Sequence, residues 1–132
     1  MSGVRAPTPR LAQAYRATLY AAPGLRVRIG RRPQGWPLPG REIVLLGACN
    51  PGGRLLPPGV NARRMAALRR CLRDVAWREG EGRLGHWAEP FLAAAMPLAR
   101  ARFLARRFGQ NAVVVLRRGQ VARLVWLSAT NF

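Results

Sequence analysis

Glu89 and His86 are the residues whose types point most directly to proton-transfer chemistry. A carboxylate and an imidazole can each take up and release protons near neutral pH, and His86-x-x-Glu89 places them three residues apart. In a regular strand, however, positions three apart face opposite sides, whereas Trp87 and Glu89 share one. A structural histidine is therefore the alternative to an acid–base pair, and Glu89 alone is kept as a candidate general base.

Cys49 is a second candidate, as a nucleophile placed just before a helix. Together with His86 it would form a minimal catalytic dyad, because the imidazole would activate the thiol. No feature of the sequence brings the two together, and free cysteines commonly serve as small buried side chains. Packing in the core is the alternative to nucleophilic chemistry here.

The stretch from Asn50 to Asn61, NPGGRLLPPGVN, resembles an anion cradle. Glycines let backbone N–H groups approach a ligand, and a helix that follows them offers its positive N-terminus. Arg54, Arg63 and Arg64 would add charged donors. An ordinary connection between a strand and a helix, with Asn61 as the helix N-cap, is the alternative.

The elements that position these residues follow from the hydrophobic pattern and its breaks. Thr8 and Pro9 are typical of a helix N-cap and first turn, and Gly109 is typical of the position after a helix end. The predicted elements are a helix over 8–20, strands over 25–29 and 42–48, a helix over 61–78, a strand over 84–96 interrupted at Pro90, a helix over 97–108, and two strands within 111–127.

This order, α-β-β-α-β-α-β-β, predicts a single compact α+β domain over residues 1–132. We expect a mixed or mostly antiparallel sheet of about five strands with helices packed on it. The turn-rich segment 30–41 is expected to be a hairpin connection or a flexible tongue.

The charge is extreme: all 23 basic residues are arginine, only five residues are acidic, and the net charge is +18. Such an imbalance attracts polyanions. Seven of the arginines on the predicted helices would contact phosphates: Arg63, Arg64, Arg70, Arg73, Arg102, Arg106 and Arg107. The alternative is a solvated arginine surface that reflects coding bias.

Several classes of enzyme are excluded by missing residues. Without lysine there is no Schiff base and no P-loop lysine, and no glycine-rich dinucleotide motif or G-x-S-x-G elbow is present. One histidine, two cysteines and five acids also make a zinc or two-metal site improbable. We expect no metal and no cofactor. The absence of a signal-like or membrane-spanning apolar segment, together with so few cysteines, favours a cytoplasmic protein without membrane contact.

Five ordered motifs resemble the bacterial domain-of-unknown-function family 3293, over about residues 15–115. They are Tyr15-x-x-Thr18-x-Tyr20, Asn50-Pro51, Asn61-Ala62-Arg63, Trp87-x-Glu89-Pro90 and Phe108-Gly109-Gln110-Asn111-Ala112. The resemblance implies no established activity. This chain departs from the family pattern at Cys49, where an aromatic residue is expected, and at Phe91, where a serine is expected.

The motif residues nevertheless predict a polar cluster. Asn50, Asn61, Glu89 and Gln110 fall at the ends of predicted elements or within a predicted strand, and core packing alone would not select such side chains. We expect the four to lie close together as a ligand-binding site, with Tyr15 and Tyr20 lining the approach. A purely structural hydrogen-bond network is the alternative.

These observations favour a non-catalytic module that binds RNA, DNA or an acidic nucleoprotein partner through its arginines. Two alternatives remain open. One is an enzyme that binds a small molecule or nucleotide in a polar pocket around Glu89. The other is an accessory protein-interaction subunit with an exposed apolar patch.

Overall fold

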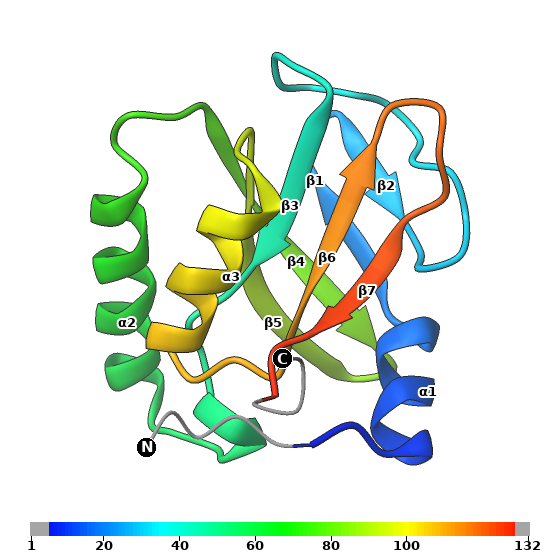
Figure 1. Cartoon of the computed structure of the whole chain (residues 1–132). Helices are drawn as coiled ribbons and strands as arrows, with labels where there is room; N and C mark the ends of the chain where they lie inside the picture. The colour runs from blue at the N-terminus through cyan, green and yellow to red at the C-terminus, as the bar shows by residue number, and fades with distance from the viewer. Residues whose placement is uncertain (1–5, 129–132) are drawn as a thin grey trace.

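The computed structural model describes residues 6–128 as an antiparallel sheet with helices against it (Figure 1). The elements are α1 (Pro9–Ala17), β1 (Leu19–Ala22), β2 (Leu25–Val27), β3 (Glu42–Leu46), the short 3-10 helix η1 (Pro51–Gly53), α2 (Pro58–Cys71), β4 (Trp77–Leu84), β5 (Trp87–Ala94), α3 (Leu98–Arg107), β6 (Ala112–Arg117) and β7 (Arg123–Trp126). The α+β class is confirmed, and every strand pair in the described residues is antiparallel.

The sheet has seven strands in the order β2-β1-β4-β5-β3-β6-β7, two more than expected. The additional strands are β1 and β4. Strand β3 lies between β5 and β6, which explains its continuous apolar sequence. The connection from β2 to β3 is not a hairpin, because β1, β4 and β5 lie between those two strands.

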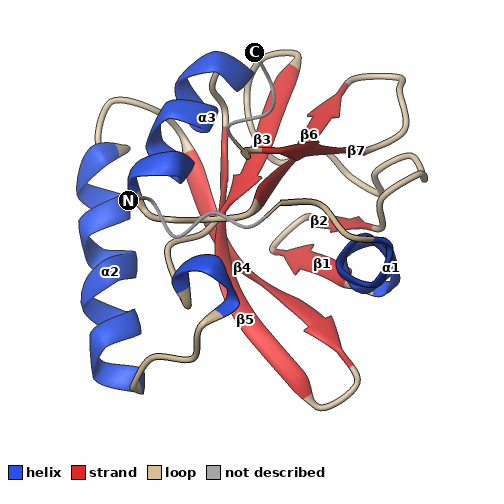
Figure 2. Ribbon diagram, turned by 60° about the horizontal axis from the view of Figure 1, so that its bottom comes forward, coloured by secondary structure: helices blue, strands red, loops and turns tan. Residues whose placement is uncertain are grey.

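Two hydrophobic clusters lie on opposite faces of the sheet. On one face α2 and α3 cover β5, β3 and β6, burying Met65, Leu68 and Leu104 against Val44 and Leu92. Figure 2 shows both helices on the same side, with β1 and β2 away from them. The second cluster joins Leu25 of β2 to side chains of β3 and β6, which requires the sheet to curl. Trp36 and Leu38 from the 30–41 segment pack into this second cluster.

The first helix is shorter than expected. Thr8 caps it as predicted, with its Oγ1 accepting a hydrogen bond from the N–H of Leu11 at 3.1 Å, and Pro9 is its first residue. The helix ends at Ala17 because Thr18 adopts an extended conformation, and the chain continues as β1. The expectation that the helix reaches Tyr20 is wrong: Tyr20 is a buried strand residue.

Strand β4 was not expected, because WREGEGRL contains two glycines and four charged residues. Each glycine lies directly across from an aromatic residue: Gly82 opposite Tyr20 in β1, and Gly80 opposite Phe91 in β5. A Cβ on Gly80 would lie 2.7 Å from the ring of Phe91, so the glycine makes room for that ring. Cross-strand packing, rather than local propensity, forms this strand.

The hairpin β4–β5 also corrects the expectation at Pro90. We expected the strand to be interrupted there, yet β5 runs through it. The pairing of β3 with β5 ends at Leu46 opposite Leu92, so Pro90 lies beyond the part of β5 that β3 flanks. A proline is tolerated where one side of a strand has no partner.

Helix α2 begins at Pro58, with Pro57 as its N-cap, so the expectation that Asn61 caps it is wrong. It also ends at Cys71, earlier than expected, because the chain then turns into β4. The expectations for the last helix and the last two strands are confirmed, including a positive φ of 68° at Gly109.

Candidate functional site

The chain turns sharply after β3, and Asn50 stands at the turn with φ 48° and ψ 64°. It is the only described residue other than glycine with a positive φ. Asparagine tolerates this left-handed conformation better than most residues because its short polar side chain bonds locally. Gly52 and Gly53 continue the turn, also with positive φ, through η1. This backbone aims the side chain of Asn50 across the end of the sheet.

Asn50 and Asn61 lock each other in place. The backbone N–H of Asn50 donates to Asn61 Oδ1 at 3.0 Å, and Asn61 Nδ2 donates to Asn50 Oδ1 at 2.8 Å. Asn50 Oδ1 also accepts the backbone N–H of Leu56 at 2.9 Å. Because its oxygen is engaged twice, the amide of Asn50 is fixed with its Nδ2 pointing the other way. Asn61 lies within α2 and thus holds the turn before the helix through its side chain. It does not serve as the N-cap of α2.

Asn50 Nδ2 donates to Glu89 Oε1 at 2.8 Å, which joins the turn to β5. Burial raises the pKa of the Glu89 carboxyl, and the hydrogen bond from Asn50 opposes that rise only in part. Glu89 is therefore a half-buried carboxyl held by a neutral amide donor.

Gln110 and Arg64 brace the same turn from the helix side. Gln110 Nε2 donates to the carbonyl oxygens of Cys49 and Phe108, at 3.0 and 3.2 Å. Arg64 Nε donates to the carbonyl of Ala48 at 2.6 Å, and its terminal nitrogen donates to the carbonyl of Phe108. Both side chains satisfy backbone oxygens at the ends of β3 and α3, where no ladder or helix bond is available.

A cavity of about 240 Å³ opens beside this turn, between α1, β1, β5 and the start of β6. Five of the six residues expected to form a ligand site line it: Tyr15, Tyr20, Asn50, Glu89 and Gln110. Asn61 lies behind Asn50 and lines a second, more open groove of about 540 Å³. Asn50 and Glu89 line both spaces and therefore separate the cavity from the groove. The fold thus brings together the polar residues that the sequence singled out.

The two tyrosines are held by aromatic contacts. The ring of Tyr20 meets Phe91 edge to face at 5.8 Å between centroids, and that of Tyr15 meets Trp126 in the same way at 5.6 Å. Burial raises the pKa of Tyr20, and the nearby Glu89 contributes a smaller rise. Tyr20 is therefore neutral and serves as a rigid wall with a hydroxyl. The sequence did not indicate Thr18, Trp87 and Phe91 as lining residues, because their positions depend on the strand pairing.

The acids of this chain are almost all matched by arginine. Four of the five form ion pairs: Glu42 with Arg117, Asp74 with Arg100, Glu79 with Arg69, and Glu81 with Arg83. Glu89 forms none with the arginines that the structure describes, and no described arginine lines its cavity. Arg69 lines the adjoining groove with Glu89 but is paired with Glu79, so Glu89 has no ion-pair partner among the described arginines.

The expected anion cradle at 50–61 lacks its donors. The N–H of Gly52 donates to Gly109 at 2.8 Å, that of Gly53 to Asn50 at 2.9 Å, and that of Arg54 to Pro51 at 3.1 Å. The helix that follows starts with two prolines, which have no N–H to offer. The glycines therefore form the turn. The segment 50–61 is an ordinary connection between a strand and a helix, which is the alternative given by the sequence.

The Cys49–His86 dyad is not formed. His86 is exposed in the turn between β4 and β5, whereas Cys49 is buried in the helix-side core. Burial raises the pKa of Cys49 to about 11, so the thiol is protonated at neutral pH. Cys49 packs in the core, which is the alternative to nucleophilic chemistry given by the sequence.

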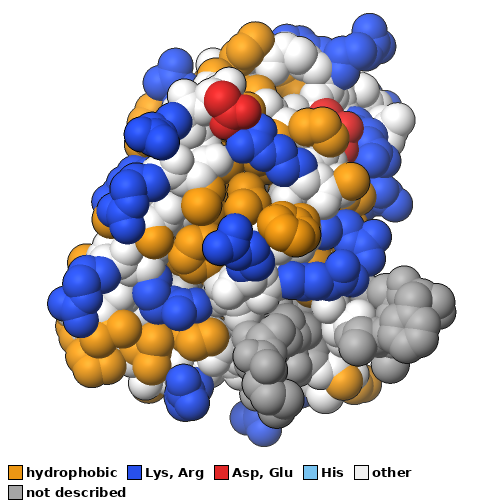
Figure 3. All heavy atoms as spheres, turned by 60° about the vertical axis from the view of Figure 1, so that its left-hand side comes forward, with side chains coloured by type: hydrophobic (Ala, Val, Ile, Leu, Met, Phe, Trp, Pro, Cys, Tyr) orange, Lys and Arg blue, Asp and Glu red, His pale blue; other side chains and the backbone are white. Residues whose placement is uncertain are grey.

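The arginines of the helices are unequal. Arg63, Arg70, Arg73 and Arg107 are exposed, and Figure 3 shows basic side chains spread over the α2–α3 side with hydrophobic ones between them. The others are engaged or shielded. Arg64 is half-buried in the bonds described above, Arg106 donates to the carbonyl of Leu127 at 3.2 Å, and the Nε of Arg102 is buried. The seven arginines therefore do not form one free surface.

Comparison with known proteins places the chain in a family. A family model described as "Protein of unknown function (DUF3293)" matches residues 46–113, just over half of the 132 residues. The chain belongs to this family. No curated protein and no solved structure matches it. The part of this DUF3293 chain that matches runs from the end of β3 to the start of β6. It contains Asn50, Asn61, Glu89 and Gln110, whereas Tyr15 and Tyr20 precede it.

Within 6–128, no three His, Cys, Asp or Glu side chains gather as metal ligands would. None of the described helices combines the length and the apolar character needed to cross a bilayer.

Proposed function

We propose that this protein binds a small organic ligand in the cavity beside Glu89, the function that the sequence leaves as an alternative to nucleic-acid binding. The observation that carries the proposal is the isolation of Glu89. Every other acid has an arginine partner, yet this one faces a cavity that no described arginine lines. Perturbed carboxyls in a concave site are typical of functional sites.

The chemistry of the lining specifies the kind of ligand. The walls combine one carboxyl, two tyrosine hydroxyls and the amides of Asn50 and Gln110 with aromatic and aliphatic surface. A carboxyl and aromatic faces suit a ligand that donates hydrogen bonds and is neutral or positively charged. A carboxylate ligand would find no described cation in the cavity, and its charge would oppose that of Glu89. The volume of about 240 Å³ limits the ligand to a small molecule or to one end of a larger one.

Glu89 is also the carboxyl of this cavity, and burial raises its pKa above the ordinary glutamate value, which suits a group that exchanges a proton with a ligand. It is fixed by Asn50, and Asn50 is fixed by Asn61 and Leu56. If the bound ligand is turned over, Glu89 is the general base or acid, and Asn50 positions it.

Three probes that share a phenyl ring and differ in charge test the proposal: benzylamine, benzamide and benzoate. Each is titrated into the isotope-labelled protein, and the shifts of the backbone amide resonances are measured. We expect benzylamine and benzamide to shift the resonances of Gly47, Gly82 and Asn111 at the cavity, and benzoate to leave them in place. The Glu89→Gln variant, which keeps the size of the side chain, should lose the response to benzylamine.

The matched control is Glu81→Gln, which removes the same charge from an exposed position outside this cavity. It should bind the probes like the original protein. The proposal is wrong if benzoate binds most tightly of the three probes at the cavity. It is also wrong if Glu89→Gln leaves the response to benzylamine unchanged.

The charge supports a second candidate function, the binding of RNA or DNA. One specific observation favours it: four acids are each matched by one arginine, and the remaining described arginines form no ion pair. The charge of the exposed ones among them is thus available to phosphate groups. The test is binding of nuclease-treated protein to RNA and to DNA at about 50 and about 200 mM salt, a range over which several phosphate contacts lower affinity by orders of magnitude. Binding to one nucleic acid that persists at the higher salt supports this function, whereas weak binding to both that disappears there contradicts it.

A further inference from the structure

A groove lined by arginines lies at the opposite end of the sheet from α2 and α3. It has a volume of about 560 Å³ and runs over β2 and the turn that follows it. Its basic residues come from three places, the end of α1, β2 and the turn: Arg16, Arg26, Arg28, Arg31 and Arg32. None of these five was among the arginines expected to contact phosphates.

The fold brings these arginines together from separate elements, and they do not lie along the surface of one helix. In β2, Leu25 and Val27 point into the core beneath the curled sheet, so Arg26 between them points to the outer face. Figures 1 and 2 show β1 and β2 away from α2 and α3, and Arg26 and Arg28 are exposed there. The groove therefore lies on a part of the sheet that these two helices leave open.

The backbone that carries the arginines is held on both sides. Arg26 exchanges two backbone hydrogen bonds with Gln34, of 3.0 and 2.8 Å, which fastens the returning chain to the edge of β2. The turn is fastened to the β6–β7 connection: Gly30 donates to the carbonyl of Ala122, and Ala122 donates to that of Arg31, at 2.9 and 2.8 Å. The guanidinium groups thus extend from a fixed frame, which reduces the entropy lost when a ligand binds.

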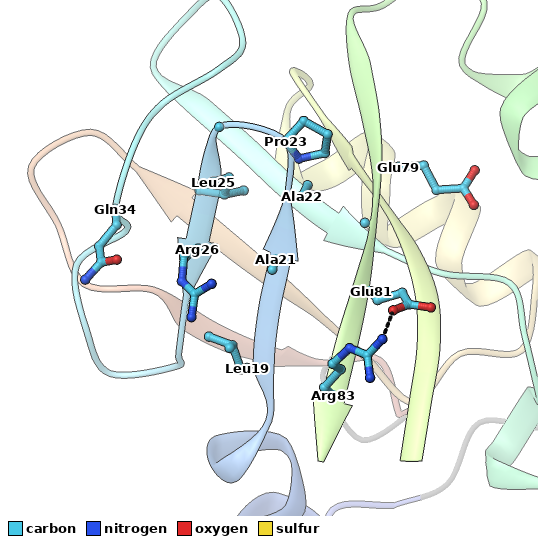
Figure 4. A pocket seen from close by; sticks show the side chains of 12 residues that line it. Leu19, Ala21, Ala22, Pro23, Leu25, Arg26, Gln34, Glu79, Glu81 and Arg83 are labelled. Atoms are coloured by element: carbon cyan, nitrogen blue, oxygen red, sulfur yellow. Dashed lines mark hydrogen bonds and ion pairs between the residues drawn. The ribbon is translucent and has the colours of Figure 1, made fainter. Parts of the chain in front are cut away.

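The charge of the groove is not cancelled locally. No acid lines it, and two acids, Glu79 and Glu81, line the adjoining groove of about 670 Å³. Figure 4 shows that groove, with Arg26 and Gln34 on one side and Glu81 joined to Arg83 on the other. Glu79 is likewise paired, with Arg69 at 2.8 Å. Arg26 borders both grooves, and its guanidinium group forms no hydrogen bond or ion pair with the described residues.

We propose that this β2 groove is the site that binds the phosphate backbone of single-stranded nucleic acid. The inference rests on the second candidate function given above and assigns it to particular residues. Arginine forms paired hydrogen bonds to phosphate oxygens, and the five arginines of this groove complement a strand that carries one negative charge at each nucleotide. No aromatic side chain lines the groove, so recognition goes through the backbone and not through stacking on the bases.

The experiment compares two variants that remove the same charge. The groove variant is Arg26→Ala/Arg28→Ala/Arg31→Ala, and the helix variant is Arg63→Ala/Arg70→Ala/Arg73→Ala. All six side chains are exposed and make no hydrogen bond within the described residues, so both variants should fold, as thermal melts will show. The probe is a labelled oligothymidylate of about 20 nucleotides, whose affinity is measured by fluorescence anisotropy over a range of salt concentrations.

We expect the groove variant to lower the slope of log affinity against log salt by about 2, since each phosphate contact to a single strand contributes about 0.7. The helix variant should keep a slope close to that of the original protein. In addition, titration of the isotope-labelled original protein should shift resonances within 25–34, a measurement that does not depend on either variant.

Three results would overturn the assignment in distinguishable ways. If the helix variant loses the slope and the groove variant keeps it, binding takes place on α2. If both lose the same amount, the attraction is diffuse and no site exists. If the original protein does not bind the oligonucleotide at about 50 mM salt, the nucleic-acid function itself fails, and the groove fails with it.

Discussion

Asn50 Nδ2 lies 2.8 Å from Glu89 Oε1, and this bond ties the turn after β3 to the outer half of β5. The two residues are 39 positions apart in the chain. Asn50 reaches Glu89 because its own backbone is left-handed and its oxygen is held by Asn61 and Leu56. A neutral amide thereby occupies the position next to the carboxyl that an arginine takes at every other acid.

The first prediction concerns the stability of Glu89→Gln. Because the folded protein raises the pKa of Glu89, the ionised carboxyl is less favourable in the folded than in the unfolded chain. The contribution of Glu89 to stability is thus greatest below the ordinary glutamate pKa and is lost as the pH rises through the folded value. We expect Glu89→Gln to be more stable at neutral pH, by about 1 kcal/mol, as is common when a strained functional group is removed.

Urea unfolding measured from about pH 7 down to about pH 4, near the ordinary glutamate pKa, checks this. The gain should shrink as the pH falls. Glu81→Gln, an exposed and paired position, should change the unfolding free energy by less than about 0.5 kcal/mol at either pH. A loss of stability in Glu89→Gln at neutral pH would favour a purely structural network.

The second prediction separates the two roles of Asn50. Asn50→Ala removes the side-chain bonds and places alanine at φ 48°, whereas Asn50→Gly removes the bonds and accommodates the backbone. We expect a loss of about 3 kcal/mol for alanine and about 2 kcal/mol for glycine, from the lost hydrogen bonds and the left-handed conformation. Chemical unfolding measures both. Equal losses would mean that the backbone conformation contributes nothing.

The third prediction is that Arg64 is structural and Arg63 is not. Arg64 donates to the carbonyls of Ala48 and Phe108 in a half-buried place. Without Arg64 the carbonyl of Ala48 loses this donor, and that of Phe108 keeps only the hydrogen bond from Gln110. Arg64→Ala should cost about 2 to 3 kcal/mol in unfolding free energy. Arg63→Ala, which removes the same charge from an exposed neighbour, should stay within about 0.5 kcal/mol. Similar values for the two variants would contradict the assignment.

The fourth prediction tests the glycine in β4. A Cβ on Gly80 would lie 2.3 Å from the carbonyl oxygen of Ala21 and 2.7 Å from Phe91, so Gly80→Ala must push β1 or the ring away. We expect a loss of about 2 to 3 kcal/mol. Gly59→Ala in the first turn of α2 meets only the far end of Arg63, at 3.9 Å, and should be neutral or slightly stabilising. Thermal melts of the two variants give the comparison, and equal melting temperatures would exclude the close approach.

The sequence predicted those elements whose local pattern and tertiary role agree. The cap at Thr8, the apolar run of β3, the helix that begins after Pro97, and the two last strands all follow from short-range preferences. The sequence also predicted the polar cluster of Asn50, Asn61, Glu89 and Gln110, because such side chains at the ends of elements need hydrogen-bond partners. Their convergence is therefore a prediction that the sequence supports.

Tertiary structure alone decided the rest. Strand β4 exists because Tyr20 and Phe91 cover its glycines from neighbouring strands, and no window of the sequence contains that contact. Asn61 bonds Asn50 instead of capping α2, and Arg64 supports backbone carbonyls instead of facing solvent, because the turn after β3 passes directly beside them. The isolation of Glu89 from the arginines, and the alignment of Arg26 with Arg28 and Arg31, are likewise products of strand pairing. Sequence sets which side chains are present and their local preferences, whereas the electrostatic environment of each depends on neighbours that only the fold brings close.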